Sequence, residues 1–207
     1  MQAFLDGEPL DAKDASFAAA VSAAAASSEK QHRIIVQVMA DGHAVSDECL
    51  QDPLRSTVSA QRLEFVSVAP EQLVATTLEN AADVLGETRA TQLAAAEQLQ
   101  LGEQEQAFVQ LGPVLETWSA VQAAVQNSAA VLKIDVTVLG TRAGVELKPL
   151  IAGLSSHLGQ LKNAIEAKDW SSAADTLAYD LDSQCEQWTI ALKKLSESLG
   201  KAAGTRG

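Results

Sequence analysis

The chain has 207 residues, of which 47 % are hydrophobic and only 4 % aromatic, and it carries a formal net charge of −12. Its 27 acidic residues outnumber 15 basic ones, and the longest basic cluster is Lys193-Lys194. Contacts with phosphate groups need clustered Lys and Arg, so this composition argues against binding to nucleic acids and against docking on an anionic membrane. Abundant alanine with few aromatic residues favours helices packed on helices.

The two cysteines, Cys49 and Cys185, lie far apart and belong to no metal-ligand spacing. This pattern predicts neither a disulfide framework nor a zinc site, and we expect no cofactor. Free cysteines suit a reducing compartment, so we expect a cytoplasmic protein. The alanine-rich stretch 16–26 follows an acidic segment, whereas export signals begin with positive charge, so we interpret it as part of an ordinary helix.

Residues 1–69 change their hydrophobic period several times, which predicts a small α+β domain. A first strand runs into the turn dipeptide Asp6-Gly7, and a short second strand contains Pro9. A helix over 14–27 follows, with Phe17, Val21 and Ala24 on one face. The β-branched run 33–39 ends in a second turn dipeptide, Asp41-Gly42. A helical turn near 47–50 and an alternating strand over 62–68 complete the segment.

This order of elements places one helix across one face of a small mixed sheet, which resembles the arrangement of ubiquitin-like β-grasp domains. The alternative is an irregular α+β cap on the helices that follow. The strand-to-turn sequence Phe4-Leu5-Asp6-Gly7 is also echoed at Val38-Met39-Ala40-Asp41-Gly42. We interpret the echo as turn chemistry and nothing more.

Residues 70–200 predict an antiparallel bundle of four long α-helices, over about 70–99, 103–130, 145–168 and 170–199. Pro70 and Glu71 are start signals for the first helix. Gly112-Pro113 is expected to kink the second helix or to mark its start. The third helix carries apolar residues at steps of three and four, the spacing of neighbours on one helix face, and the fourth continues the same heptad register. The third carries Leu147, Ile151, Leu154, Leu158, Leu161 and Ile165; the fourth carries Trp170, Ala174, Leu177, Leu181, Trp188, Leu195 and Leu199.

A faint internal repeat supports two helical hairpins. Gly102-Glu103, Ala107, Leu111 and Leu115 match Lys168-Asp169, Ala173, Leu177 and Leu181 at a constant offset of 66. Each match begins the second helix of a pair. Between the hairpins, the alternation of Ile134, Val136 and Val138 predicts extended chain over 131–144. The tail 201–207 is expected to be disordered.

No pattern of catalytic residues stands out. His32, His43 and His157 belong to no metal-binding motif, so we interpret each as a surface histidine. Asp175, Tyr179 and Asp182 are spaced for one helix face with Glu186 one turn on. Such carboxylates carry out acid–base chemistry only when they are buried together with separated pKa values, and the same spacing is typical of a solvated helix face. The sequence therefore favours a protein that is not an enzyme.

The leading hypothesis is a non-catalytic protein-interaction module: an adaptor, an assembly factor or an export-chaperone-like protein that binds a partner helix in a groove between its own helices. Self-association as a homodimer belongs to the same class, with the helix that carries Trp170 and Trp188 as the first candidate for the contact. The expected partner or junction surface comprises Trp170, Asp175, Tyr179, Asp182 and Trp188. The alternative is a small-ligand binder or enzyme with its site at the junction of the two domains, lined by Asp175, Tyr179 or His157.

Overall fold

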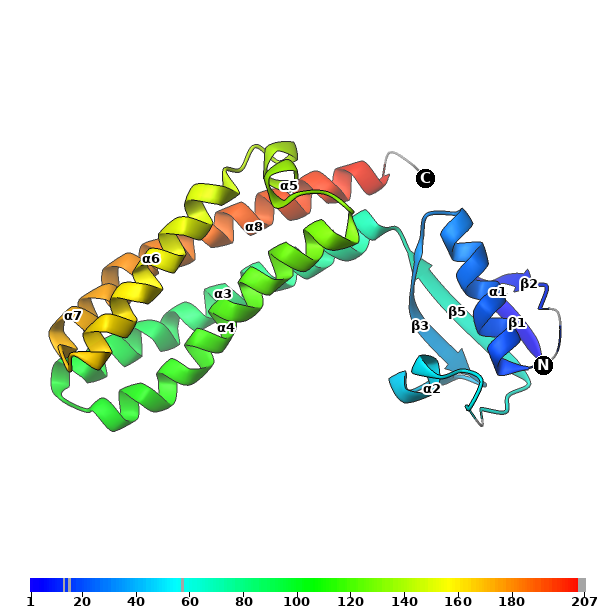
Figure 1. The fold of residues 1–207 in the computed structure, drawn as a ribbon, viewed down its shortest axis with the longest axis horizontal. Helices are drawn as coiled ribbons and strands as arrows, with labels where there is room; N and C mark the ends of the chain where they lie inside the picture. The colour runs from blue at the N-terminus through cyan, green and yellow to red at the C-terminus, as the bar shows by residue number, and fades with distance from the viewer. Residues whose placement is uncertain (13, 15, 57, 205–207) are drawn as a thin grey trace. The chain divides into compact units, whose positions relative to one another are not determined.

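The computed structural model describes residues 1–12, 14, 16–56 and 58–204, and it confirms the predicted α+β class. A small five-stranded mixed sheet at the N-terminus is followed by a helical region (Figure 1). Two compact units comprise Met1–Leu73 and Val74–Gly207, here called the N-terminal unit and the helical unit.

The N-terminal unit is a mixed sheet with one long helix packed against it. The strands are β1 (Gln2–Leu5), β2 (Glu8–Leu10), β3 (Ile34–Ala40), β4 (His43–Ala44) and β5 (Arg62–Val68), in the order β2-β1-β5-β3-β4. β1 and β5 are parallel neighbours and the other pairs are antiparallel. Helix α1 (Phe17–Lys30) begins at the cap Ser16, whose hydroxyl accepts from the Ala19 amide. A short helix, α2 (Asp47–Gln51), precedes β5.

The core of this unit forms between α1 and one face of the sheet. β5 alternates strictly, so that Leu63 and Phe65 are buried while Arg62 and Glu64 lie on the other face. Phe17, Ala20 and Ala24 of α1 pack against that buried face, at the helical spacing expected from the sequence. On the open face the Arg62 guanidinium lies 4.2 Å from the centre of the Phe4 ring and pairs with Glu64 at 2.8 Å.

The two Asp-Gly turns hold the central strand β5 at opposite ends. Asp6 and Asp41 both have positive φ angles, 50° and 47°, and the glycine after each is also left-handed, as the two-residue hairpin turn requires. The Asp41 carboxylate accepts the backbone amides of Gln61 and Arg62 at 2.8–3.1 Å, where β5 begins. The Asp6 carboxylate accepts the Ser67 amide at 2.7 Å, where β5 ends. The two similar strand-to-turn sequences therefore form two turns whose aspartates hydrogen-bond to opposite ends of the same strand.

Asp6 belongs to a small polar cluster at its end of the strand. Its second carboxylate oxygen accepts from the Ser67 hydroxyl at 2.6 Å and lies 3.4 Å from Arg33 Nε. Arg33 also donates to the Ser67 hydroxyl and carbonyl, at 2.7 and 2.5 Å. Partial burial raises the pKa of Asp6, but the Ser67 hydrogen bonds and the Arg33 charge outweigh that effect and hold it below its ordinary 3.8.

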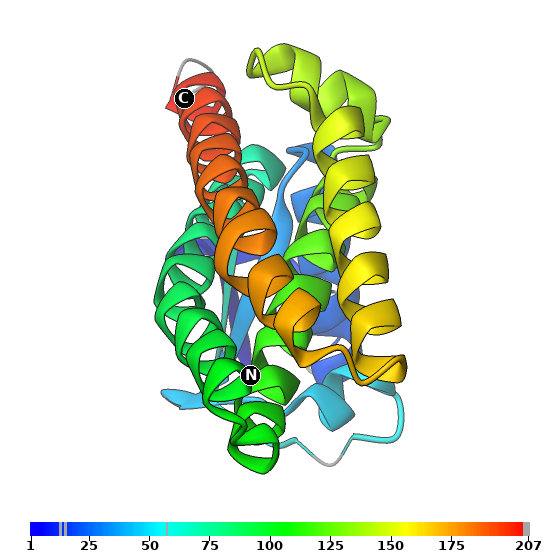
Figure 2. The same ribbon diagram turned by 90° about the vertical axis from the view of Figure 1, so that its left-hand side faces the viewer.

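The helical unit consists of two long hairpins joined by a short helix. α3 (Pro70–Leu101) and α4 (Gln104–Val131) form the first hairpin, and α6 (Leu147–Glu166) with α7 (Trp170–Asp175) and α8 (Leu181–Gly204) forms the second. The two hairpin turns lie at the same end of the bundle (Figure 1 and Figure 2). They share one geometry: Gly102 and Lys168, 66 residues apart, both have positive φ and donate to the carbonyl three residues back.

The connection between the hairpins corrects a prediction, because residues 131–144 are not extended. They contain helix α5 (Val136–Arg142), which lies at the other end of the bundle from the hairpin turns (Figure 1). Asp135 caps it, since its side chain accepts from the Thr137 amide at 2.7 Å. Gly140 allows the close return of the chain: a Cβ there would lie 2.4 Å from the Val145 carbonyl. The alternating valines misled because Leu139, the residue after Val138, supplies the buried contact.

The expected single fourth helix is divided by a π-helical turn over Thr176–Asp180. This turn inserts one residue, and the internal repeat records it. As far as Leu177, the second residue of the turn, the offset is 66: buried Ala107 and Leu111 correspond to buried Ala173 and Leu177. After it the offset becomes 67. The buried pairs beyond the turn are Val114 with Leu181, Trp118 with Cys185, Val121 with Trp188 and Val125 with Leu192. The predicted match of Leu115 with Leu181 is thus wrong: Leu115 is exposed.

The structure excludes one of the two alternatives for Gly112-Pro113 and corrects the expected start of the tail. Pro113 lies inside α4, which begins at Gln104, so it does not start the helix. The tail was expected to be disordered from residue 201, but α8 continues to Gly204 because Leu199 remains buried and anchors the last turns. Residues 205–207 lie outside the described part of the chain.

Candidate functional site

The middle of the helical unit contains a buried polar network centred on Gln92 of α3. Its side-chain nitrogen donates to the Leu177 carbonyl at 3.0 Å, and its oxygen accepts from Trp118 Nε1 at 3.2 Å. The Cys185 thiol lies 3.8 Å from the same oxygen. Leu177 lies in the π turn, where the widened backbone removes carbonyls from the regular helical ladder. Gln92 therefore supplies a hydrogen-bond donor to a carbonyl of the π turn. Through its two hydrogen bonds it connects α3 with α4 and with the π turn.

The carboxylates predicted to share one helix face do not form an acid–base pair. Asp182 accepts two bonds from Arg89, at 2.5 and 2.7 Å, and Glu186 pairs with the same guanidinium at 2.7 Å. These bonds, first those of Asp182, raise the pKa of Arg89 above its ordinary value, although its partial burial opposes the rise. Asp175 lies apart on the solvent side, before the π turn. The arrangement is an interhelical ion-pair cluster between α3 and α8.

The aromatic residues of the expected partner surface are divided between core and surface. Trp188 is fully buried, so its assignment to a partner surface is wrong: its helix turns it toward the bundle core. Trp170 is half-buried and meets the Phe108 ring of α4 edge to face, with ring centres 5.8 Å apart. Tyr179, in the π turn, is 70 % exposed. Of the expected surface, Trp170, Asp175 and Tyr179 are accessible.

The two remaining candidates, His157 and Cys185, lie in separate parts of the helical unit, His157 on α6 and Cys185 on α8. His157 accepts or donates at 3.2 Å to Gln160 and lies 3.8 Å from Asp180. Burial raises the pKa of the Cys185 thiol to about 12, with the Asp182 charge adding to the effect, so the reactive thiolate is suppressed at neutral pH. Within the described residues, no group of three or more His, Cys, Asp or Glu side chains is placed to hold a metal ion. Among the same residues, no helix combines the length and the apolar character that crossing a membrane requires.

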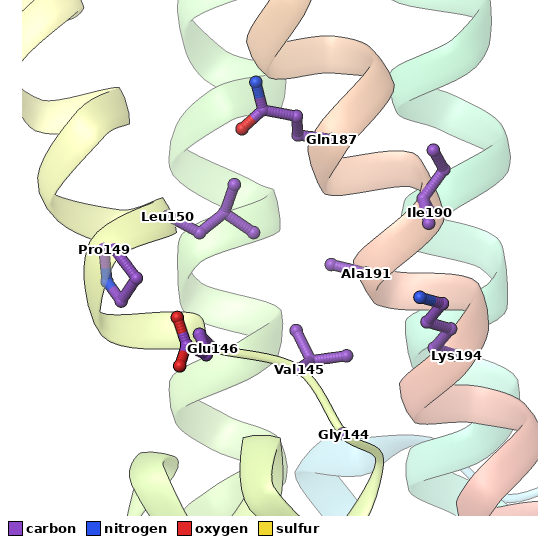
Figure 3. A pocket seen from close by; sticks show the side chains of 9 residues that line it. All are labelled: Gly144, Val145, Glu146, Pro149, Leu150, Gln187, Ile190, Ala191 and Lys194. Atoms are coloured by element: carbon purple, nitrogen blue, oxygen red, sulfur yellow. The ribbon is translucent and has the colours of Figure 1, made fainter.

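A cleft of about 430 Å³ opens between the start of α6 and the second half of α8 (Figure 3). Leu150 of α6 and Gln187 and Ala191 of α8 point into it from opposite sides, and Val145 lies at its lower end (Figure 3). Glu146 and Lys194 are its two charged lining residues. The remaining lining residues are Gly144, Pro149 and Ile190. The cleft is thus lined about equally by apolar and polar surface and is open to solvent, with one charge of each sign at its border.

Ile190 is the most exposed large apolar residue of α8, at 56 %. It lines the α6–α8 cleft on one side and, on the other, a second hollow of about 310 Å³ between α3 and α8, whose floor includes Cys185. On the buried side of the same helix, Gln184 Oε1 and Trp188 Nε1 have no hydrogen-bond partner among the described residues. Ile190 of α8 thus lies between two hollows.

The sequence model of one protein family matches residues 76–191, more than half of the chain. The chain belongs to the family described as Domain of unknown function (DUF8042). The matched range extends from the second turn of α3 to the middle of α8, and it includes every residue that lines the α6–α8 cleft except Lys194. No curated protein and no solved structure matches the chain.

The cleft was missed at the level of sequence, although a signal was present. Ile190 lies two residues after Trp188, which places it on the opposite side of an α-helix at about 100° per residue. An isoleucine on the side of the helix opposite the apolar stripe faces away from the core, and it therefore indicates an exposed apolar surface. Leu150 gave no such signal, because α6 has a broad apolar face to which Leu150 could equally belong. The first turn of that helix borders the cleft.

Proposed function

We propose that the DUF8042 region is a non-catalytic protein-interaction module, as in an adaptor, an assembly factor or an export-chaperone-like protein. The α6–α8 cleft holds an apolar segment of its protein partner. The observation that carries this proposal is the open cleft, about half of whose lining is apolar, with the exposed Ile190 at its border. Apolar side chains gathered at a concave surface mark sites of association, because burying them releases free energy at about 25 cal/mol per Å².

The lining of the cleft favours a peptide segment over a reacting substrate. Its volume suits a few side chains, and helices commonly bind partner helices through apolar anchors in such grooves. Glu146, the residue before α6, and Lys194 of α8 have opposite charges on the two sides of the cleft, an arrangement that orients a partner at the rim. Neither charge is accompanied by a nucleophile with an activating base in the lining. The alternative site at the junction of the two units stays a prediction.

The experiment places a photo-crosslinking amino acid at position 190 or 187 in the full-length protein, expressed in its own cells. We expect one discrete crosslinked protein from both positions, identified by mass spectrometry. The matched control is position 84, since Val84 is an exposed valine of α3 that lines neither hollow. If position 84 gave the same crosslinked protein in equal yield, the proposal that the α6–α8 cleft binds the partner would be refuted.

A pair of variants connects the crosslink to the apolar surface. Ile190→Asp is expected to lower recovery of the crosslinked partner at least about tenfold, because it places a charge in an apolar contact. Val84→Asp introduces the same charge on a similarly exposed residue and should leave recovery unchanged. Circular dichroism of both variants checks that the helices persist. A crosslink to a second copy of this chain, with a matching dimer in sedimentation equilibrium, would replace the separate partner with self-association.

A further inference from the structure

A second apolar surface lies on α4, apart from the α6–α8 cleft. Phe108, Val109 and Leu115 are 40 %, 76 % and 41 % exposed, and Trp170 of α7 contacts Phe108. We call these four residues the α4 patch. None of them lines the cleft, and Phe108 and Val109 lie in the first two turns of α4, which begins just after the hairpin turn at Gly102. It is a surface that the proposed function does not use.

The centre of the α4 patch is occupied by two residues that disfavour a helix. Gly112 and Pro113 are exposed within α4. In an exposed helix interior they are about 1 and 3 kcal/mol less favourable than alanine. A Cβ added at Gly112 would meet no heavy atom within 4 Å, so no packing within the protein accounts for that glycine. The missing side chain leaves open space on the helix surface between Phe108 and Leu115.

The charged residues of α4 beside the patch are all acidic, whereas Lys168 precedes Trp170 by two residues. Glu105 precedes Phe108 and Val109 by one helical turn, and Glu116 follows Gly112 by one turn, so both lie beside the patch. α4 contains no Lys or Arg. Residues 74–131 carry seven acidic residues and a single basic one, Arg89, which is already paired with Asp182 and Glu186 on α8. An apolar patch bordered only by carboxylates on its own helix complements a segment with apolar and cationic faces.

From this charge complementarity we propose that the α4 patch binds a basic amphipathic helix of a partner protein. The apolar face of that helix lies over Phe108, Val109 and Leu115, with a side chain above Gly112. Its Lys or Arg side chains pair with Glu105 and Glu116. The chain then presents two separate docking surfaces, the neutral α6–α8 cleft and the acidic α4 patch, which is the arrangement of a protein that joins two partners.

The test uses two synthetic helical peptides of 18 residues and the full-length protein. One peptide has leucine on one face and lysine on the other, and its counterpart has glutamate in place of every lysine. Fluorescence anisotropy is expected to show at least about tenfold tighter binding of the lysine peptide, since the glutamate peptide faces repulsion. Equal affinities for the two peptides would overturn the proposal.

Variants separate a specific site from general attraction to an acidic protein. Glu105→Lys with Glu116→Lys is expected to weaken binding about fivefold, the sum of two exposed ion pairs. The matched control is Glu79→Lys with Glu87→Lys on α3, which changes the net charge equally away from the patch and should weaken binding less than twofold. Equal losses from the two double variants would refute the site.

The apolar part of the patch is tested separately. Val109→Ser should weaken the lysine peptide about threefold or more through lost apolar contact, and the high exposure of Val109 makes it dispensable for folding. Phe108→Ser should have the larger effect, but it also removes the contact with Trp170. Ile190→Asp, in the cleft, should leave this peptide unaffected, so that failure at one surface is distinguishable from failure at the other. Burial of the patch in a dimer, seen by sedimentation, would also overturn the proposal.

Discussion

The two units of this protein stabilise their backbones with different kinds of polar group. In the N-terminal unit, two carboxylates near the surface, Asp6 and Asp41, accept backbone amides at the two ends of β5. In the helical unit, the neutral amide of Gln92 does the corresponding work in a fully buried position, where it bridges Trp118 and the π turn.

The difference follows from where each unit interrupts its regular structure. A strand in a small sheet begins and ends at the surface, where a charged carboxylate stays hydrated and remains ionised. The π turn interrupts a helix inside a bundle, where an unpaired charge would cost far more than a neutral amide. The stability of the N-terminal unit should therefore depend on pH. The stability of the helical unit should instead depend on single buried hydrogen bonds.

The largest expected effect comes from Gln92→Ala. This change leaves Trp118 Nε1 and the Leu177 carbonyl buried without partners and opens a cavity, at an expected cost of about 3 to 5 kcal/mol in the free energy of unfolding. Urea unfolding followed by tryptophan fluorescence measures it, because all three tryptophans lie in the helical unit. Gln100→Ala, an exposed glutamine on the same helix, should change stability by less than about 0.5 kcal/mol. A loss below about 1 kcal/mol for Gln92→Ala would contradict the bridging role.

A smaller effect is expected from Asp41→Ala, which removes the acceptor of two β5 amides. Because the site is exposed, water replaces part of the interaction, and the expected loss is about 1 to 2 kcal/mol. Hydrogen exchange of the Gln61 and Arg62 amides should accelerate, as measured by NMR. Asp41→Asn retains an acceptor oxygen and tolerates the positive φ angle, so it should keep most of the protection. Equal exchange rates in all three proteins would show that the Asp41 hydrogen bonds contribute nothing.

The smallest effect concerns the pH dependence of the N-terminal unit. The folded-state pKa of Asp6 lies below 3.8, despite the burial that raises it, because the Ser67 hydrogen bonds and Arg33 favour the charged form. Its stabilising contribution is therefore complete above 3.8 and is lost as the pH falls through the lower folded value. Exchange of β5 amides between about pH 5 and pH 2 should show a weaker pH dependence of stability in Asp6→Asn than in the native chain. Identical slopes would remove Asp6 from the acid response.

Much of the local structure was readable from short patterns of residues. The alternation of β5, the spacing of Phe17 and Ala24 in α1 and the two Asp-Gly turns each act over a few residues, so their physical causes are present in the sequence itself. The same patterns misled over 131–144, where alternating valines predicted extended chain. There the cap at Asp135 and the tight return at Gly140 favour a helix, and the packing of Leu139 decides between the two.

The candidate sites were less predictable because they depend on which side of a helix faces a neighbour. Trp188 was assigned to a surface and lies in the core, whereas Ile190, on the opposite side of α8, borders the cleft. The ion pairs of Asp182 and Glu186 with Arg89 join residues about ninety positions apart, and no local pattern specifies that contact.

The sequence by itself determined the α+β class, the positions of most strands and helices and the acidic, alanine-rich character of the surface and core, because these follow from interactions between near neighbours along the chain. Only the tertiary structure decided that Asp6 and Asp41 hold the same strand, since this depends on β1 running parallel and β3 antiparallel to β5. It also decided the π turn. An apolar spacing of three and four residues looks the same in the sequence with or without a single inserted residue. The insertion becomes visible only in the structure, where Gln92 and the buried pairs after the π turn fix the position of each residue along the helix.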